Sequence, residues 1–220
     1  RDSVIYTVEK YHDKLASKCK LFTSEREGYV PITKFFDKIV SVKDILEKFQ
    51  EYYCEEDFRR MIVLDALILN TDRHMGNYGF IVNNETMQVK RMAPMFDHNQ
   101  SLLPYAEKED FKNLDIYLAS RPTQIGEDFN EVAHALLTPD IQSDLRNLKG
   151  FEFEQNGEYN LSEQRLKELN RLIDRQIDGI LESKRLYIPS NEYTNNLYES
   201  EQYNNDISLE SDEIDEDLEI

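Results

Sequence analysis

The 220-residue sequence has few cysteines, few basic residues and no long apolar run. Its two cysteines, Cys19 and Cys54, are too few for a disulfide scaffold, so we expect free thiols in a reducing compartment. No stretch of about 18 apolar residues is present, which argues against a membrane-spanning helix. No secretory signal pattern is visible either. We therefore expect a cytoplasmic protein that does not associate with a membrane.

Basic residues are outnumbered, with 26 Lys and Arg against 44 Asp and Glu, and the formal net charge is −18. This shortage argues against a nucleic-acid partner, because phosphate binding requires clustered Lys and Arg. Much of the acidity falls in residues 187–220, which hold 11 Asp and Glu and no Lys or Arg. We expect this segment to be a disordered acidic tail, either merely solvated or used for docking.

The rest of the chain contains enough aromatic residues, mainly Phe and Tyr, for a packed core. Residues 4–8 and 15–22 have the pattern of two strands around a turn at His12-Asp13, and residues 25–31 indicate a loop. Helices are then expected over 41–53, capped by Ser41, and over 55–69, the latter buried on nearly all sides. A hairpin is predicted over 80–92, followed by helices over 109–119, 128–137, 139–148 and 162–183. This order of elements predicts an α+β fold.

The chemically informative segment runs from Asn70 to Asp97. It places five functional side chains on loops beside buried apolar elements: Asp72, Arg73, His74, Asn77 and Asp97. Asp72 and Asn77 share one tight loop, and the predicted hairpin returns Asp97 close to them. Phosphoryl transfer uses this layout: a carboxylate orients the attacking hydroxyl, while an amide oxygen and a second carboxylate hold Mg²⁺ against nucleotide phosphates. Protein kinases have the same spacing and order.

Two strings, from Leu69 to Gly79 and from Met92 to Asp97, resemble the C-terminal kinase domain of HipA-like proteins. The motif of that family, Asn-x-Asp-x-His-x-x-Asn, is present in full here. The Asp-Arg-His-x-x-Asn part is also similar to phosphatidylinositol kinases. The resemblance implies a two-lobed protein-kinase-like fold, ATP and Mg²⁺ as cofactors, and transfer to Ser or Thr of a protein. Several HipA-like proteins are toxins, so it also implies an antitoxin-type partner.

By the same resemblance, Asp72 is the catalytic base, Asn77 and Asp97 are the Mg²⁺ ligands, and His74 lies beside the nucleotide phosphates. We further expect residues 1–24 to be the remnant of a small lobe with its hinge, with Lys20, Leu21 and Phe22 contacting the adenine. Residues 25–186 would form a helical catalytic lobe with an embedded hairpin. No glycine-rich loop or ATP-binding Lys is evident, and we expect both to precede Arg1 in a longer protein.

Other interpretations of these residues remain open. In one alternative, Asp72, His74, Asp97 and His98 are the ligands of a metal-dependent phosphoesterase, which leaves Asn77 and the hairpin unexplained. A kinase-like binding module without activity and a lipid or small-molecule kinase are two further alternatives. Arg73 has two equally supported roles, in a structural ion pair with Asp65 or in phosphate binding.

Overall fold

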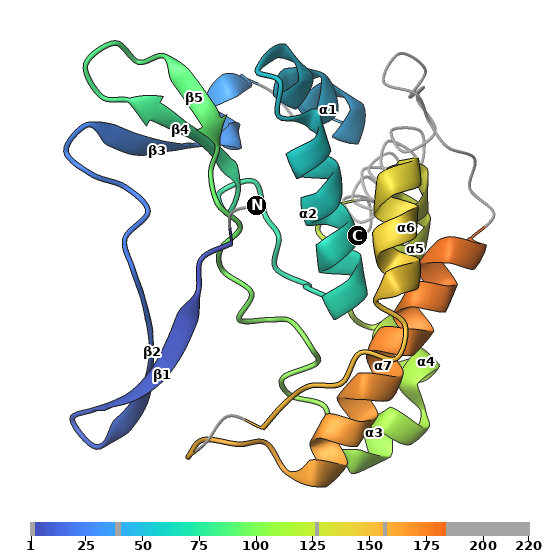
Figure 1. Ribbon diagram of the computed structural model, residues 1–220. Helices are drawn as coiled ribbons and strands as arrows, with labels where there is room; N and C mark the ends of the chain where they lie inside the picture. Colours follow the sequence, from blue (N-terminus) through green and yellow to red (C-terminus); the bar gives the residue numbers. More distant parts are fainter. Residues whose placement is uncertain (1–2, 38–40, 126–127, 156–157, 184–220) are drawn as a thin grey trace, which may run out of the picture.

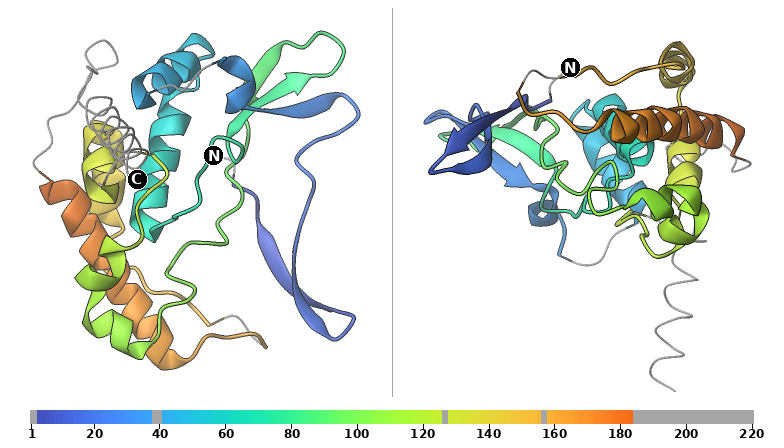
Figure 2. Two further views of the ribbon diagram at one scale, coloured as in Figure 1. Left: turned by 180° about the vertical axis from the view of Figure 1, so that it is seen from behind. Right: turned by 90° about the horizontal axis from the view of Figure 1, so that it is seen from below.

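A computed structural model describes residues 3–37, 41–125, 128–155 and 158–183 (Figure 1). Within these ranges it contains two small antiparallel sheets and seven α-helices, which confirms the predicted α+β class. The strands gather on one side of the molecule and the helices on the other, as the views in Figure 2 also show. The acidic segment 187–220 lies outside the described residues, so its predicted disorder stays a prediction.

The first sheet is an isolated two-stranded hairpin. Strand β1 (Tyr6–Tyr11) pairs antiparallel with strand β2 (Lys14–Cys19). Both residues of the predicted turn have positive φ, 45° for His12 and 62° for Asp13, as a type I′ hairpin turn requires. Most residues of both strands are exposed, and the hairpin projects from the body of the molecule (Figure 1).

The second sheet has three strands in the order β3-β4-β5. Strands β4 (Gly79–Asn83) and β5 (Val89–Met92) form the predicted hairpin. The expectation of a loop over 25–31 was wrong, because β3 (Glu27–Pro31) pairs antiparallel with β4. Gly28 and Pro31 obscure this strand in the local sequence, and its partner lies some fifty residues later along the chain. Pro31, which has no N–H, stands at the end of an edge strand, where none is needed.

A short 3₁₀ helix, η1 (Ile32–Phe35), leads from the sheet toward helix α1 (Val42–Glu51). The predicted cap of α1 is confirmed. Asp44 N–H donates to Ser41 Oγ at 3.2 Å, and Ser41 N–H donates to Asp44 Oδ2 at 2.8 Å, which together form a capping box. Phe49 of α1 then packs on Phe80 of β4, with ring centroids 4.7 Å apart. This contact joins the helix to the sheet.

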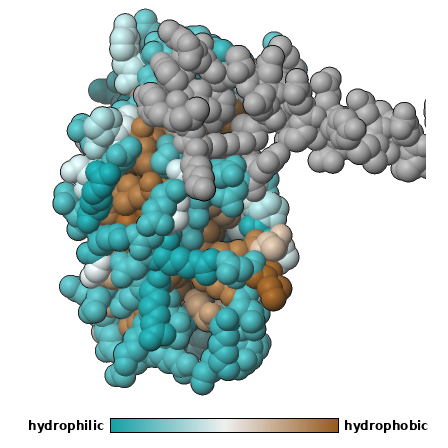
Figure 3. Space-filling view, turned by 90° about the vertical axis from the view of Figure 1, so that its right-hand side faces the viewer, coloured by the Kyte–Doolittle hydropathy of each residue, from teal (hydrophilic) through white to brown (hydrophobic). Residues whose placement is uncertain are grey.

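Helix α2 (Glu55–Ile68) is the central element. One side packs on α1 and the sheet, and the other packs on α5 (Phe129–Ala135), α6 (Pro139–Asn147) and α7 (Glu163–Glu182). The prediction that α2 is buried nearly all round is therefore confirmed. Seen from the side of α5–α7, the surface is mostly hydrophilic, with apolar residues visible between the polar ones (Figure 3). These helices thus turn their apolar faces toward α2.

The predicted helix over 109–119 is two shorter helices, α3 (Lys108–Lys112) and α4 (Leu114–Ala119). The break falls at Asn113, whose φ of −121° and ψ of 46° are not helical. This segment packs on α7 through a third apolar cluster, which includes Leu103 and Leu172. None of the described helices is both long and apolar enough to cross a membrane.

Candidate active site

The loop that follows α2 is fixed to the helix from its first residues. Leu69 has left-handed backbone angles, with φ and ψ both 52°, and turns the chain out of the helix. Asn70 is fully buried; its Nδ2 donates to Asp65 Oδ1 at 2.9 Å, and its Oδ1 accepts from Asp72 N–H at 3.2 Å. The backbone of Asp72 is thereby held in place, while its side chain stays partly exposed.

Asn77 closes the same loop onto Asp72. The Asn77 Nδ2 atom donates to the carbonyl oxygen of Asp72 at 3.1 Å, and Asn77 is 7% exposed. Because the amide nitrogen is engaged, the carbonyl Oδ1 is the atom of this side chain that remains for a ligand. The structure therefore brings two of the predicted site residues into one rigid loop.

Arg73 is the centre of a buried network. Its side chain is 1% exposed and forms a bidentate ion pair with Asp65, with Nε–Oδ2 at 2.8 Å and Nη2–Oδ1 at 3.0 Å. Its Nη1 donates to two carbonyl oxygens, those of Asn77 at 3.0 Å and Phe96 at 2.7 Å. All of these groups belong to the protein, which favours the structural role of Arg73 over a role in phosphate binding.

Asp97 follows directly after Phe96, so the Arg73 network also sets its position relative to Asn77. Asp97 has a φ of 59°, a left-handed conformation that Asp tolerates better than most residues. Its N–H lies 3.3 Å from Tyr6 Oη of β1. The backbone that carries the Asp97 carboxylate is thus held on one side by Arg73, through Phe96, and on the other by Tyr6.

The two histidines of the segment have separate, local roles. His74 is exposed, and its Nδ1 accepts from Gly76 N–H at 3.0 Å. His98 Nδ1 lies 3.0 Å from Arg73 Nη2, and since Arg only donates, this nitrogen is the acceptor. Burial and the neighbouring guanidinium hold the pKa of His98 below its usual value. Within the described residues no three His, Cys, Asp or Glu side chains are grouped as metal ligands, so the phosphoesterase interpretation has no support.

The predicted hinge residues line a cavity of about 600 Å³ at the base of the first hairpin, called here the hinge cavity. Lys20, Leu21 and Phe22 form part of its wall. None of Asp72, His74, Asn77 and Asp97 lines it, so the Asp72–Asn77 loop and the expected adenine contacts are neighbours rather than one pocket.

An aromatic cluster joins the hinge cavity to the loops of the site. The Phe22 ring lies 5.2 Å from Phe96 and 5.9 Å from Tyr29, measured between centroids. Tyr29 Oη donates to the carbonyl of Gly76 at 2.8 Å, within the Asp72–Asn77 loop. Burial raises the pKa of Tyr29, which keeps its hydroxyl protonated and able to donate. The hinge is thus packed directly against the residue that precedes Asp97.

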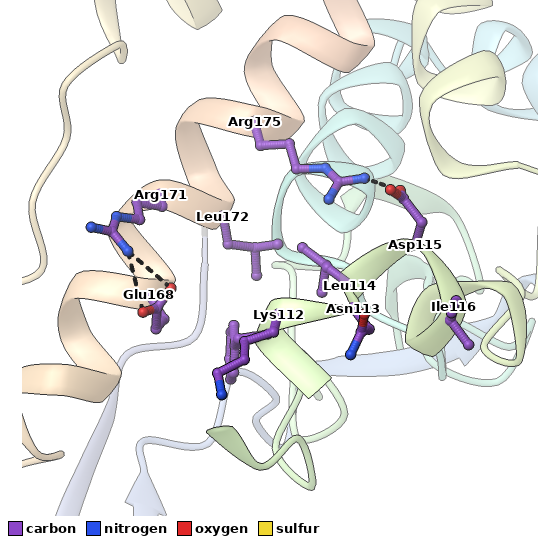
Figure 4. A pocket seen from close by; sticks show the side chains of 10 residues that line it. Lys112, Asn113, Leu114, Asp115, Ile116, Glu168, Arg171, Leu172 and Arg175 are labelled. Atoms are coloured by element: carbon purple, nitrogen blue, oxygen red, sulfur yellow. Dashed lines mark hydrogen bonds and ion pairs between the residues drawn. The ribbon is translucent and has the colours of Figure 1, made fainter. Parts of the chain in front are cut away.

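A second cavity, of about 490 Å³, lies between α3–α4 and α7, away from these loops (Figure 4). Four of its charged residues pair with one another, Arg171 with Glu168 and Arg175 with Asp115, and Lys112 pairs with Glu109 beside it. We call it the α7 cavity. Since its charges are mutually satisfied and it shares no lining residue with the hinge cavity, it is not part of the candidate active site.

No protein-family model matches the chain, and no curated protein does either. Among solved structures, the chain is similar to the crystal structure of a Helicobacter pylori proinflammatory kinase, CtkA. The TM-score is 0.58 at 21% sequence identity, over 82% of this chain and 79% of that one. The chain has a kinase-like fold. At this identity the likeness describes the arrangement of the elements and not the chemistry.

Within this kinase-like fold, three residues of the site were not predicted from the sequence. Tyr29 and Phe96 join the hinge to the catalytic loop, and Tyr6 contacts Asp97 across the hairpin base. Their contacts connect segments far apart in the chain, so no local signal in the sequence identifies them. Asp65 was foreseen from the sequence as a buried acid with which Arg73 could pair, beside the alternative of phosphate binding.

Proposed function

We propose that the protein is an ATP- and Mg²⁺-dependent kinase related to HipA-like proteins, which phosphorylates Ser or Thr of a protein substrate. The observation that supports this most strongly is the double hydrogen bond from Arg73 Nη1. It fixes the backbone of Asn77 and that of the residue before Asp97 to one nitrogen atom. A toxin role and an antitoxin-type partner stay predictions that the kinase-like fold does not address.

The residues present suit Mg²⁺. Asn77 offers its amide oxygen, because its nitrogen is bonded to Asp72, and Asp97 offers a carboxylate. Oxygen donors of this kind are those that Mg²⁺ prefers. When bound, the ion would neutralise charge on the nucleotide phosphates. Arg73 keeps the two ligands at a constant separation, and the hinge cavity would take the adenine against Lys20, Leu21 and Phe22.

In the proposed reaction, Asp72 orients the acceptor hydroxyl and takes its proton. A bond forms between the hydroxyl oxygen and the γ-phosphorus, the bond to the β–γ bridging oxygen breaks, and ADP leaves with that electron pair. The partial exposure of Asp72 gives a substrate access to its carboxylate. His74, the exposed neighbour, would lie beside the phosphates.

Transfer of ³²P from γ-labelled ATP tests this proposal. The acceptors are the protein itself, dephosphorylated casein, and vesicles containing phosphatidylinositol, so that protein and lipid kinases are distinguished. We expect Asp72→Asn to lower incorporation into casein by about 10²- to 10⁴-fold, the usual contribution of a general base. Asp140→Asn, at an exposed position on α6, is the matched control and should keep full activity.

Equal incorporation by the wild-type protein and Asp72→Asn would remove Asp72 from the mechanism. Labelling of the lipid alone would establish the alternative of a lipid kinase. Absence of transfer by the wild-type protein, together with retained ATP binding, would establish a kinase-like binding module instead.

A further inference from the structure

The hinge cavity is lined by cationic and apolar residues together. Of its described lining residues, Lys18, Lys20 and Arg91 are charged and none is acidic. Its apolar lining consists of Val4, Ile5, Leu21, Phe22 and Pro94. A ligand that fits this lining carries negative charge for the cations and aliphatic groups for the apolar residues. An extended acidic peptide with interspersed aliphatic residues has both.

The cations that line the cavity have few or weak ion pairs among the described residues. Lys20 has no ion pair within the described residues. Lys18 pairs with Glu9 at 2.9 Å, but the two side chains are 63% and 45% exposed, and an exposed pair of this kind contributes little and exchanges readily. Arg91 pairs with Glu27, also at the surface. A multiply charged ligand would therefore displace only weak internal contacts.

The chain itself contains a segment with the required chemistry. Of the fifteen residues 206–220, eight are Asp or Glu, five are Ile or Leu, two are Ser, and none is Lys or Arg. The aliphatic residues are interspersed among the acids rather than grouped: Ile207, Leu209, Ile214, Leu218 and Ile220. No other stretch of the chain has this composition.

We propose that residues 206–220 dock in the hinge cavity of the same chain, with carboxylates against Lys18, Lys20 and Arg91 and aliphatic side chains against its apolar lining residues. The α7 cavity is a poorer receptor. It also presents three cations, Lys112, Arg171 and Arg175, but Asp115 and Glu168 line it beside them and offset their charge (Figure 4).

The length of the chain permits this docking. Helix α7 ends at Glu182, and 22 residues lie between Ser183 and Asp206. Fully extended, they span about 70 Å. A folded body of some 180 residues has a radius of gyration of about 16 Å, so the segment reaches any face of it.

Docking would regulate the proposed kinase, and this consequence rests on the proposed function. The adenine is expected against Lys20, Leu21 and Phe22, which line the same cavity. A docked acidic segment and a nucleotide would therefore exclude one another. Because the segment is tethered, its effective concentration at the cavity is on the order of millimolar, enough for a weak contact to be largely formed.

Alkylation of the native cysteines by iodoacetamide tests the docking without any nucleotide. Cys19 is exposed and lines the hinge cavity, whereas Cys54 is 5% exposed and burial raises the pKa of its thiol. Cys19 therefore reports occupancy of the cavity, and Cys54 is the internal control for unfolding. We compare the native protein with a full-length variant in which the eight acids of 206–220 are replaced by Asn or Gln.

We expect neutralisation of the segment to accelerate Cys19 alkylation about tenfold at low salt and to have no effect at 1 M salt, where ion pairs are screened. We define the ratio as the rate of Cys19 alkylation with the neutralised segment divided by the rate with the native segment. This ratio should fall to about one when both proteins also carry Lys18→Glu/Lys20→Glu. The same ratio should stay near ten in the matched control, in which two cations of the α7 cavity are replaced instead (Lys112→Glu/Arg171→Glu). Taking a ratio cancels any direct effect of these charges on the thiol.

Three results would overturn the proposal. A ratio of one in the native background would mean that the segment does not occupy the cavity. A ratio unaffected by the lysine substitutions would place it elsewhere. A ratio that rises with protein concentration would assign the occupant to a second copy. Since no ATP is present, none of these outcomes depends on whether the protein is a kinase.

Discussion

At the scale of single residues, the geometry of the candidate site depends on the guanidinium group of Arg73. Arg73 bonds to a helix, to the loop of Asn77 and to the segment that leads to Asp97, using all three of its nitrogens. A lysine at this position would keep the charge but lacks the planar fork of donors that reaches several acceptors at once. The arginine is a positioning residue, since its contacts are to protein groups.

We predict that Arg73→Lys lowers the free energy of unfolding by about 2 kcal/mol, because two buried hydrogen bonds of about 1 kcal/mol each are lost. Urea denaturation measures this change. Arg171→Lys, at a side chain that is 75% exposed, is the control and should change stability by less than about 0.5 kcal/mol. Equal effects of the two substitutions would contradict the role given to Arg73.

A second prediction at this scale concerns Asn77. If its Oδ1 binds Mg²⁺, Asn77→Ala should raise the Mg²⁺ concentration for half-maximal binding of a fluorescent ADP analogue by about tenfold or more. Asn77→Asp supplies an oxygen at nearly the same place and should weaken the binding much less. Nucleotide binding that keeps its Mg²⁺ dependence in an Asn77→Ala/Asp97→Ala protein would refute the metal site.

At the scale of elements, strands β3 and β4 of the three-stranded sheet pack closely at Gly79. A Cβ atom at Gly79 would lie 2.2 Å from the carbonyl oxygen of Val30 on the neighbouring strand. We predict that Gly79→Ala destabilises the protein by about 1–3 kcal/mol, since the backbone of Val30 must move. At Gly28, on the same sheet, the added atom would meet only the movable side chain of Asn84, and Gly28→Ala should cost less. Thermal denaturation of both variants tests the difference.

The cap of α1 gives another prediction for an element. Ser41→Ala removes one half of a reciprocal capping box and should cost about 1 kcal/mol of stability. Ser17→Ala, at an exposed position of β2, should be close to neutral. A chemical denaturation curve for Ser41→Ala that overlays the wild type would show that the cap contributes nothing.

The helices and the β4–β5 hairpin were predictable because their signals are local, such as the Ser41 cap and the apolar run of α2. Strand β3 was not, because its evidence lies in a partner strand far along the chain. The same distinction holds for the site: the Asp72–Asn77 spacing can be read from the sequence, whereas the contact of Tyr29 with Gly76 cannot.

At the scale of the whole molecule, stability is unevenly distributed. The β4–β5 hairpin contributes to one apolar cluster and α2 contributes to two, whereas the β1–β2 hairpin is exposed on both faces. We predict that backbone amides of 6–19 exchange hydrogen with solvent at least about a hundredfold faster than those of β4, because local opening there breaks few contacts. Exchange measured by mass spectrometry tests this, and equal protection of the two sheets would contradict it.

The base of that hairpin has a mechanical consequence. Val4 N–H bonds to the carbonyl of Met95 at 2.9 Å, and Phe22 packs on Phe96, so both ends of the hairpin segment are attached to consecutive residues. Two attachment points so close together define a pivot. Rotation about it would carry the turn at His12-Asp13 through a wide arc while Asp97, adjacent to the axis, scarcely moved. The volume of the hinge cavity can therefore change as the hairpin turns, and the contact between Tyr6 Oη and the Asp97 N–H is the link through which that movement would reach the candidate site.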